Sequence, residues 1–547
     1  MSCEQGILRK KWESIIVLIL LLLIGTAVFL YWSAKKEVWF CDEVYSYQSA
    51  NGFEQGWPGE EYGRWMSGEE VSAYFSADWD KPALDYIGTT LYSDHVPLYF
   101  WIFRAVSYFG FHGSASLWIG FSINLFFFLT LIIVAYKVFE HLTRKPLAAG
   151  VIVFLSCVAN RLVLQQAMTL RMYMMLLWAE VLLLAAGFWV MKNHTGWRQK
   201  LLAHLMLYGV SVFGFLTHYD FWIFYAVVAT VFCLRLVICA LKKEKTKFWR
   251  AEEFRSVVFW MINFVAALGT ELLAFKYSRW NLFRDKGAMA MDTLFDFSKD
   301  KLAQIRWGYD HLTICIFGEG FPGWIGWVLI FGFILSGAFV LYKRREFSHM
   351  EELLLPVAVT QLYQLAVCFS MPGENVERYL WGSYTITLMA ALWGGVLLVK
   401  YAVEQLPAGV YRRWAKIAVS ICLVFTFLLW QVKIIDGGDG IIYLFHSGKD
   451  MKQLEEKQDV PWVVYGPQGG AYSYYDFTIP EKICFISGQE AEELQTLSVL
   501  EGEGEVILYV QDVLLADAVA VMEDYMGRTL QAEYLCNSVN MNVYLVK

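Results

Sequence analysis

Residues 14–32 read SIIVLILLLLIGTAVFLYW, a predominantly apolar run that follows the basic residues Arg9, Lys10 and Lys11. A run of this length can cross the hydrocarbon core of a bilayer as one α-helix. No small-residue cleavage site follows it, which distinguishes it from a secretory signal peptide. The stretch therefore predicts an uncleaved first membrane helix whose N-terminus lies in the cytoplasm.

The rest of the chain continues this pattern. Of its 547 residues, 57% are hydrophobic and only 18% are charged, which is too apolar for one soluble domain of this length. Further apolar runs, each ended by charged or turn residues, lie at 115–137, 146–162, 169–191, 201–217, 219–241, 255–277, 322–342, 352–371, 379–399 and 414–432. The sequence predicts an α-helical polytopic membrane protein with about eleven transmembrane helices.

Lysine and arginine residues show which side of the membrane each connection occupies. They gather in every second connection, at 137–145, 192–200, 242–255, 343–345 and 400–416. Connections rich in these residues stay on the cytoplasmic side. We therefore expect the other connections to lie on the outer side, at 33–114, 278–321, 372–378 and 433–547.

The last outer segment differs from the others in its pattern. It contains β-rich runs at 462–465, 482–486 and 506–510, a helical pattern at 514–525 and a closing strand pattern at 532–546. We expect residues 433–547 to form a small C-terminal extracytoplasmic α/β domain. Residues 1–432 would form the transmembrane domain, with 33–114 as its large first outer loop.

Charge and cysteine content argue against two classes of function. The net charge is −7 and the basic residues gather in short connections, so nucleic acid is not an expected partner. The ten cysteines are scattered singly, without the paired spacing of a zinc site, and no metal ligand is assigned. Asp78-Trp79-Asp80 leaves a divalent cation open as an alternative to a solvated acidic pair.

Ionisable side chains gather at the outer boundary of the membrane. Asp42 and Glu43 stand just beyond the outer end of the first helix, where a carboxylate among aromatic residues can act as a general base. Adjacent acids also occur at ordinary solvated helix ends. The same boundary carries Asp94-His95 with Tyr99, Arg171 with Tyr173, His218 with Tyr219 and Asp220, and Arg378 with Tyr379.

Each of these clusters also has an ordinary structural explanation, such as a capped helix start or an arginine that snorkels toward the headgroups. The informative feature is that all of these clusters are expected at the same depth, the outer boundary of the membrane. A transporter would be expected to place charges near the middle of the membrane and to show broken helices in matching halves. The shared outer boundary instead favours chemistry at the membrane surface.

Five short motifs occur in a fixed order along residues 1–400. They are Trp39-Phe40-Cys41-Asp42-Glu43, Asp94-His95-Val96-Pro97-Leu98-Tyr99, Leu170-Arg171-Met172-Tyr173, Thr217-His218-Tyr219 and Glu377-Arg378-Tyr379-Leu380. The order of these motifs, together with the predicted topology, resembles that of the GT-C superfamily of polytopic glycosyltransferases. The resemblance is to bacterial members related to protein O-mannosyltransferases and lipid A aminoarabinose transferases.

The resemblance implies a GT-C fold and an inverting transfer of a hexose or pentose from a polyprenyl-phosphate carrier to an acceptor hydroxyl. It places this reaction at the outer face of a bacterial plasma membrane, among membrane lipids. Asp42 would be the general base and Glu43 would help to shape the site. Arg171 and Arg378 would hold the departing phosphate, because guanidinium matches phosphate oxygens in a forked geometry. The other expected substrate-binding residues are His95, Tyr99, Tyr173, His218 and Tyr379.

Two questions stay open in the sequence. The acceptor can be a glycan, a lipid or a protein. A transporter or flippase of lipid-linked glycans is the alternative function, because it would share the topology and the aromatic outer loops. The Asp42-Glu43 pair distinguishes the two, since transfer needs a base and transport does not.

Overall fold

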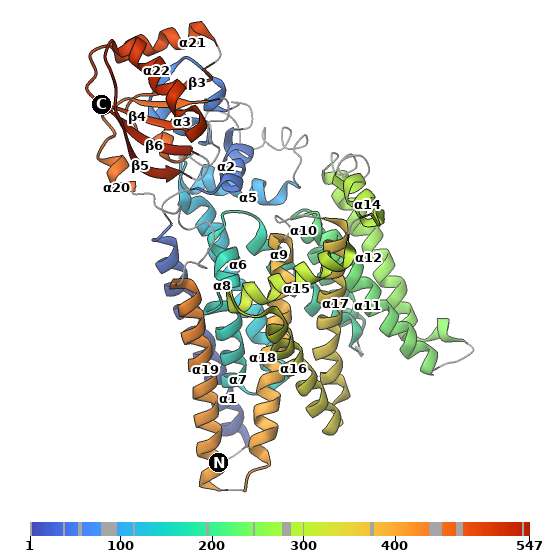
Figure 1. Ribbon diagram of the computed structural model, residues 1–547. Helices are drawn as coiled ribbons and strands as arrows, with labels where there is room; N and C mark the ends of the chain where they lie inside the picture. The colour runs from blue at the N-terminus through green and yellow to red at the C-terminus, as the bar shows by residue number, and fades with distance from the viewer. Residues whose placement is uncertain are drawn as a thin grey trace.

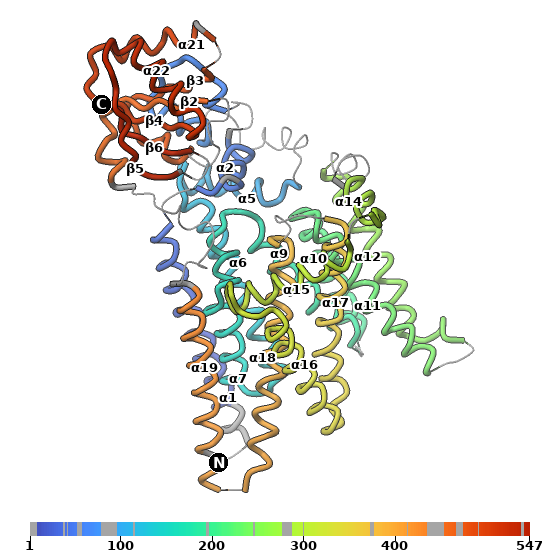
Figure 2. Tube along the Cα trace, in the orientation of Figure 1, coloured from blue at the N-terminus to red at the C-terminus, as the bar shows by residue number. Residues whose placement is uncertain are grey.

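The computed structural model describes residues 3–36, 39–52, 57–77, 96–112, 115–192, 196–243, 247–275, 286–298, 300–371, 377–407, 409–436, 451–466, 474–488, 490–538 and 541–547. These residues form a bundle of long helices with a small α/β domain over one end (Figure 1). The trace in Figure 2 starts at the opposite end of the bundle and finishes in this domain.

Nine helices of the described part are long and apolar enough to cross a membrane. They are α1 (Cys3–Ser33), α6 (Leu117–Thr143), α9 (Tyr173–Met191), α11 (Asp220–Lys243), α12 (Glu252–Ala274), α16 (Gly323–Lys343), α17 (Phe347–Ser370), α18 (Glu377–Glu404) and α19 (Val410–Asp436). A tenth crossing, bent by 54°, results if α7 (Pro146–Val153), η4 (Phe154–Val158) and α8 (Arg161–Met168) count as one span. The chain is a multi-pass membrane protein.

The predicted run at 201–217 accounts for the difference between about eleven predicted crossings and these nine or ten. It forms α10 (Trp197–Phe215), whose first turn carries Arg198 and Lys200, and this helix is not among the nine. α10 packs against α9 and α12. The rings of Tyr173 and His218 lie 6.2 Å apart, so the end of α10 meets the start of α9. α10 thus runs antiparallel to α9, and both helices have 19 residues.

Shorter helices lie between these long ones. α2 (Cys41–Tyr47), η1 (Gln48–Gly52), η2 (Pro58–Glu60), α3 (Gly68–Ala73) and α5 (Leu98–Gly110) belong to the first outer loop. η5 (Phe248–Arg250) connects α11 to α12. α14 (Lys286–Phe295) and α15 (Lys301–Phe317) lie between α12 and α16. The loop helices place the first predicted motif against the ends of the membrane helices.

The C-terminal domain contains one mixed sheet, which confirms the predicted small α/β fold. Its strands are β2 (Trp462–Tyr465), β3 (Ile483–Ile486), β4 (Val506–Val510), β5 (Ala532–Ser538) and β6 (Met541–Val546). β2 pairs in parallel with both β3 and β4, and it is fully buried because both of its faces are covered. Helices α20 (Met451–Glu455), α21 (Ala491–Gln495) and α22 (Leu515–Met526) accompany the sheet, together with η7 (Asp476–Thr478), η8 (Thr496–Leu500) and η9 (Asp512–Leu514).

The first outer loop supplies a sixth strand, which the sequence prediction did not include in this domain. β1 (Trp65–Met66) pairs antiparallel with β3, giving the order β1-β3-β2-β4-β6-β5. The Trp65 indole N–H donates to the carbonyl of Thr496 at 2.9 Å, and the Gly63 N–H donates to the carbonyl of Phe485 at 2.8 Å. These bonds cover an edge that β3 would otherwise leave unpaired. The loop therefore fastens the α/β domain over α2.

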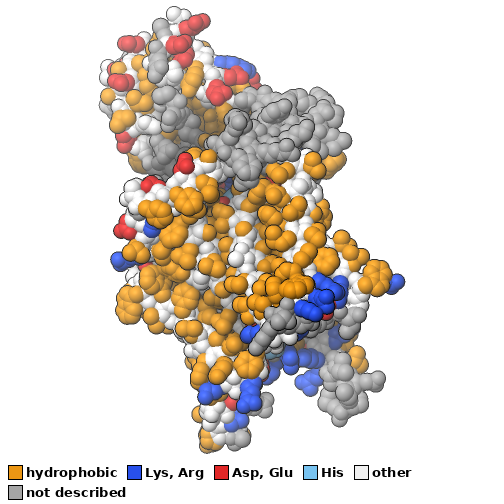
Figure 3. Space-filling model, turned by 90° about the vertical axis from the view of Figure 1, so that its right-hand side faces the viewer, with side chains coloured by type: hydrophobic (Ala, Val, Ile, Leu, Met, Phe, Trp, Pro, Cys, Tyr) orange, Lys and Arg blue, Asp and Glu red, His pale blue; other side chains and the backbone are white. Residues whose placement is uncertain are grey.

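Side-chain types are separated along the bundle (Figure 3). Hydrophobic side chains cover its middle, Lys and Arg gather toward the end away from the α/β domain, and Asp and Glu are prominent on that domain. Large exposed apolar residues on the helices include Leu23, Phe126 and Leu335. This distribution fits a molecule with lipid around its middle and water at both ends.

Candidate active site

α2 presents two adjacent carboxylates at the end of the bundle that carries the α/β domain. Asp42 and Glu43 lie in its first turn. Successive residues of an α-helix project about 100° apart around the axis, so the two side chains reach different surroundings. The Glu43 carboxylate turns back to accept the backbone N–H of Phe40 at 2.8 Å, which fixes the start of the helix.

Glu43 is enclosed by protein donors. Lys36 Nζ donates to its carboxylate at 2.9 Å, and the backbone N–H of Leu170 donates at 2.7 Å. The side chains of Lys36 and Glu43 are both 0% exposed. Burial raises the pKa of Glu43, and the Lys36 charge and the two backbone N–H groups oppose that shift. This carboxylate ties α2 to the segment before α9 and is not open to a substrate.

Asp42 faces the open part of the same cluster. Its carboxylate forms an ion pair with the guanidinium of Arg378, in the first turn of α18, and each side chain is 20% exposed. The Nε of Arg378 finds no hydrogen-bond partner among the described residues. A partly exposed carboxylate thus lies beside an arginine that has a donor to spare.

Arg171 donates hydrogen bonds to two residues of α2. Its guanidinium donates to the backbone carbonyl of Asp42 at 2.8 Å and to Ser46 Oγ at 3.1 Å. Ser46 Oγ donates to the same carbonyl at 3.3 Å. Arg171 is only 5% exposed. These hydrogen bonds determine where α2 holds Asp42.

Three aromatic side chains form a row beside the ion pair. Between ring centroids, Tyr173 lies 6.2 Å from His218, and His218 lies 5.4 Å from Tyr379. The guanidinium carbon of Arg378 lies 5.4 Å from the centre of the Tyr379 ring, a cation–π distance. His218 Nδ1 accepts the backbone N–H of Asp220 at 3.1 Å. The row joins the starts of α9, α11 and α18, so three predicted motifs meet here.

The motif that closes the first outer loop is described only in part. His95 lies outside the described residues. Tyr99, at the start of α5, is fully buried, and its ring centroid lies 6.0 Å from that of Phe103. Its hydroxyl has no hydrogen-bond partner within the described part of the chain. Tyr99 belongs to the packed wall of the cluster and not to its open part.

Lys36 is a member of the cluster that sequence reasoning missed. It follows α1 and makes the buried ion pair with Glu43. One signal could have found it, because a lysine at the outer end of the first helix runs against the expected charge distribution. Such a residue needs a local counter-charge, and the nearest acids in the sequence are Glu37, Asp42 and Glu43.

The chemical capacity of the cluster follows from its open groups. Asp42 can accept a proton, Arg378 can bind an anionic oxygen, and the aromatic row can contact the apolar face of a sugar ring. Across the described ranges, no group of three or more His, Cys, Asp and Glu side chains could hold a metal ion. The acidic pair Asp78 and Asp80 lies outside those ranges.

Comparison with known proteins gives matches in structure only. No protein-family model matches the chain, and no curated protein matches its sequence. ArnT from Cupriavidus metallidurans bound to undecaprenyl phosphate matches with a TM-score of 0.50 and 14% identity, covering 96% of this chain and 97% of ArnT. The oligosaccharyltransferase from Archaeoglobus fulgidus in its apo form matches with a TM-score of 0.51 and 11% identity, covering 95% of this chain and 72% of that chain.

Both matches extend over nearly the whole chain, including the membrane helices and the C-terminal domain. ArnT and the archaeal oligosaccharyltransferase are GT-C superfamily membrane glycosyltransferases. The expectation drawn from the five motifs is therefore confirmed at the level of the fold. This chain has the fold of the GT-C superfamily.

Proposed function

We propose that the protein is an inverting glycosyltransferase that moves a sugar from a polyprenyl-phosphate carrier to an acceptor hydroxyl. The observation that carries this proposal is the partly exposed Asp42 carboxylate paired with Arg378. It supplies a base and an anion-binding group side by side, which is the pair that such a transfer needs. The GT-C fold supports the proposal, as does the undecaprenyl phosphate bound to ArnT.

The reaction needs one displacement. Asp42 accepts the proton of the acceptor hydroxyl, and the hydroxyl oxygen attacks the anomeric carbon of the sugar. The bond between that carbon and the phosphate oxygen breaks, and its electron pair leaves with the polyprenyl phosphate. A single attack from the face opposite the leaving group inverts the anomeric configuration.

Arg378 interacts with the Asp42 carboxylate and with the donor phosphate in turn. In the structure, its guanidinium pairs with Asp42. In the proposed complex, the guanidinium turns to the phosphate, where Nε and a terminal nitrogen donate in parallel to two oxygens. This exchange frees the Asp42 carboxylate to accept a proton. It also places positive charge where the leaving group gains negative charge.

The buried residues of the cluster hold this arrangement in place. Lys36 and Glu43 fix the start of α2, and Arg171 holds the carbonyl of Asp42. We therefore assign Glu43 and Arg171 as positioning residues, although the sequence suggested direct contact between Arg171 and phosphate. Tyr173, His218 and Tyr379 border the open part and are proposed to contact the donor sugar.

Arginine-to-lysine substitutions should separate the two arginine roles. Arg378→Lys keeps the charge but loses the forked donor pair, so we expect kcat/KM to fall about 10–100-fold, because a hydrogen bond to a charged group contributes about 1.5–3 kcal/mol. The KM for the lipid-linked donor should rise as well. Arg171→Lys should lower kcat with little change in that KM, since it displaces Asp42 and not the phosphate. Steady-state kinetics over a range of donor concentrations measure both effects.

Arg306→Lys is the matched control, because Arg306 is 79% exposed on α15 and lies outside the cluster. It should behave as the parent protein does. If Arg378→Lys matches the parent in both kcat and KM, the phosphate role of Arg378 is wrong. If Arg171→Lys raises the donor KM as much as Arg378→Lys does, Arg171 contacts the phosphate directly.

The site is proposed to lie at the outer face of the plasma membrane, because the basic connections lie at the other end of the bundle. A fluorescent reporter that matures only in the cytoplasm should give no signal when fused after Lys547. The same reporter fused after Glu346, in the basic connection between α16 and α17, should fluoresce. A bright Lys547 fusion would place the site on the cytoplasmic side.

A further inference from the structure

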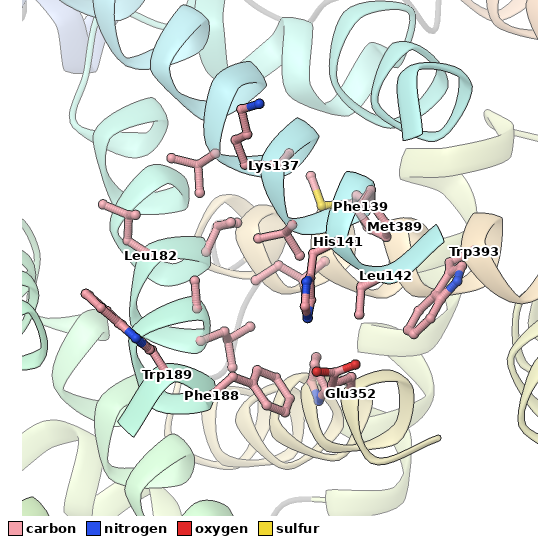
Figure 4. A pocket seen from close by; sticks show the side chains of 18 of the residues that line it. Lys137, Phe139, His141, Leu142, Leu182, Phe188, Trp189, Glu352, Met389 and Trp393 are labelled. Carbon is pink, nitrogen blue, oxygen red and sulfur yellow. The ribbon is translucent and has the colours of Figure 1, made fainter. Parts of the chain in front are cut away.

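A cavity lies at the end of the bundle away from Asp42. It has a volume of about 450 Å³ and is lined by α6, α9, α10, α17 and the middle of α18. Its walls are almost entirely apolar, with Leu182, Phe188, Met389 and Trp393 among the side chains in Figure 4. This size lies within the range of about 300–1,000 Å³ that is usual for small-molecule sites. The cavity has no part in the proposed transfer.

The rim of the cavity is charged. Lys137, His141, Lys192 and Glu352 all line it. Lys192 Nζ lies 3.4 Å from His141 Nε2, so the imidazole nitrogen can accept one ammonium proton and leave the others free to face a ligand. Lys137 is 57% exposed and pairs with Glu140 at 3.0 Å, which lies one helical turn away.

The one acid of the rim has a hydrogen-bond partner outside the cavity. Glu352 accepts a hydrogen bond from His349 Nδ1 at 2.7 Å when that nitrogen carries its proton. The two acids near these lysines, Glu140 and Glu352, thus each already have a hydrogen-bond partner of their own. An apolar cavity offers water no hydrogen-bond partners, whereas a hydrocarbon chain fills it and leaves a headgroup at the rim.

We propose that this cavity holds one acyl chain of an anionic phospholipid whose phosphate is bound by Lys137 and Lys192. Basic pockets between membrane helices on the cytoplasmic side are suited to anionic headgroups. The depth of the two lysines matches this ligand, because α6 and α9 end within a turn or two of them. The bound lipid would fill the space between the helices that line the cavity, one of which carries Arg378 in its first turn.

The test uses the full-length purified protein and two lipids with identical chains, phosphatidylglycerol and phosphatidylcholine. Lipid retained on the protein is measured by native mass spectrometry after titration. We expect phosphatidylglycerol to bind more tightly. Lys137→Gln/Lys192→Gln should weaken it by about 30-fold, because each lysine near an anionic lipid contributes a factor of about five. Binding of phosphatidylcholine should change little.

Lys242→Gln/Lys343→Gln is the matched control, since it removes two exposed lysines from the same end of the bundle but not from the cavity. It should bind phosphatidylglycerol as the parent does. Ala185→Phe should reduce binding of both lipids by filling the cavity, with gel filtration reporting that the protein stays folded. Equal affinity for the two lipids in the parent, or equal losses in the two double variants, would overturn the proposal.

Discussion

Transfer by the Asp42→Asn protein should fall by about 10²–10⁴-fold, which is the usual contribution of a general base. The amide has nearly the same shape as the carboxylate and its oxygen can still accept a hydrogen bond from Arg378. It cannot accept the proton of the acceptor hydroxyl. The loss should therefore appear in kcat, measured as sugar released from the lipid carrier per unit time.

The Asp42→Asn protein should fold and insert as the parent does, because Asp42 is partly exposed and its backbone contacts with Arg171 do not involve the carboxylate. Gel filtration and a thermal melt in detergent provide that control. Turnover close to the parent rate would remove Asp42 from catalysis and would favour transport of a lipid-linked glycan. Transport does not require a base at this position.

Glu43→Gln should sharply reduce the stability of the folded protein. The amide removes the negative charge from the buried ion pair with Lys36, and the loss of one partner from such a pair typically costs about 3–5 kcal/mol. We expect a clearly lower melting temperature in detergent and a loss of activity, because the start of α2 is no longer fixed. Asp42→Asn should also lose activity, but its melting temperature should stay normal.

Lys36→Met/Glu43→Gln provides the check on this explanation. It removes the buried charge together with its partner, so it should recover part of the stability that Glu43→Gln loses. If Glu43→Gln melts at the parent temperature, the buried pair has no role in holding α2. If the double variant melts below Glu43→Gln, the buried charge of Lys36 is not the cause of the loss.

Most of the membrane helices and the strands of the C-terminal domain could be predicted because their signals are local. The run at 506–510 became β4 with the predicted bounds, since a short apolar run between polar residues specifies a buried strand. β1 could not be predicted, because Trp65 and Met66 are a two-residue strand whose partner lies in β3, far along the chain. The predicted crossing at 201–217 covers the apolar part of α10 and leaves out its basic first turn.

The candidate site was only partly accessible from sequence. The motifs identified Asp42 and Arg378 separately, but their ion pair joins residues 336 positions apart. Only the family resemblance gave Asp42 and Glu43 different roles, because the residue types alone do not show which side of α2 each residue faces. The structure places one carboxylate in the open part of the cluster and the other in a buried pair with Lys36.

The most direct test of the proposed function is release of polyprenyl phosphate from a panel of polyprenyl-phosphate sugars by the purified protein. An extract of bacterial envelope lipids, glycans and proteins serves as the acceptor pool, and nuclear magnetic resonance gives the anomeric configuration of the product. We predict release from at least one donor, inversion at the anomeric carbon, and loss of both with Asp42→Asn. No release from any donor by the folded parent, a retained configuration, or equal release by Asp42→Asn would contradict the proposal.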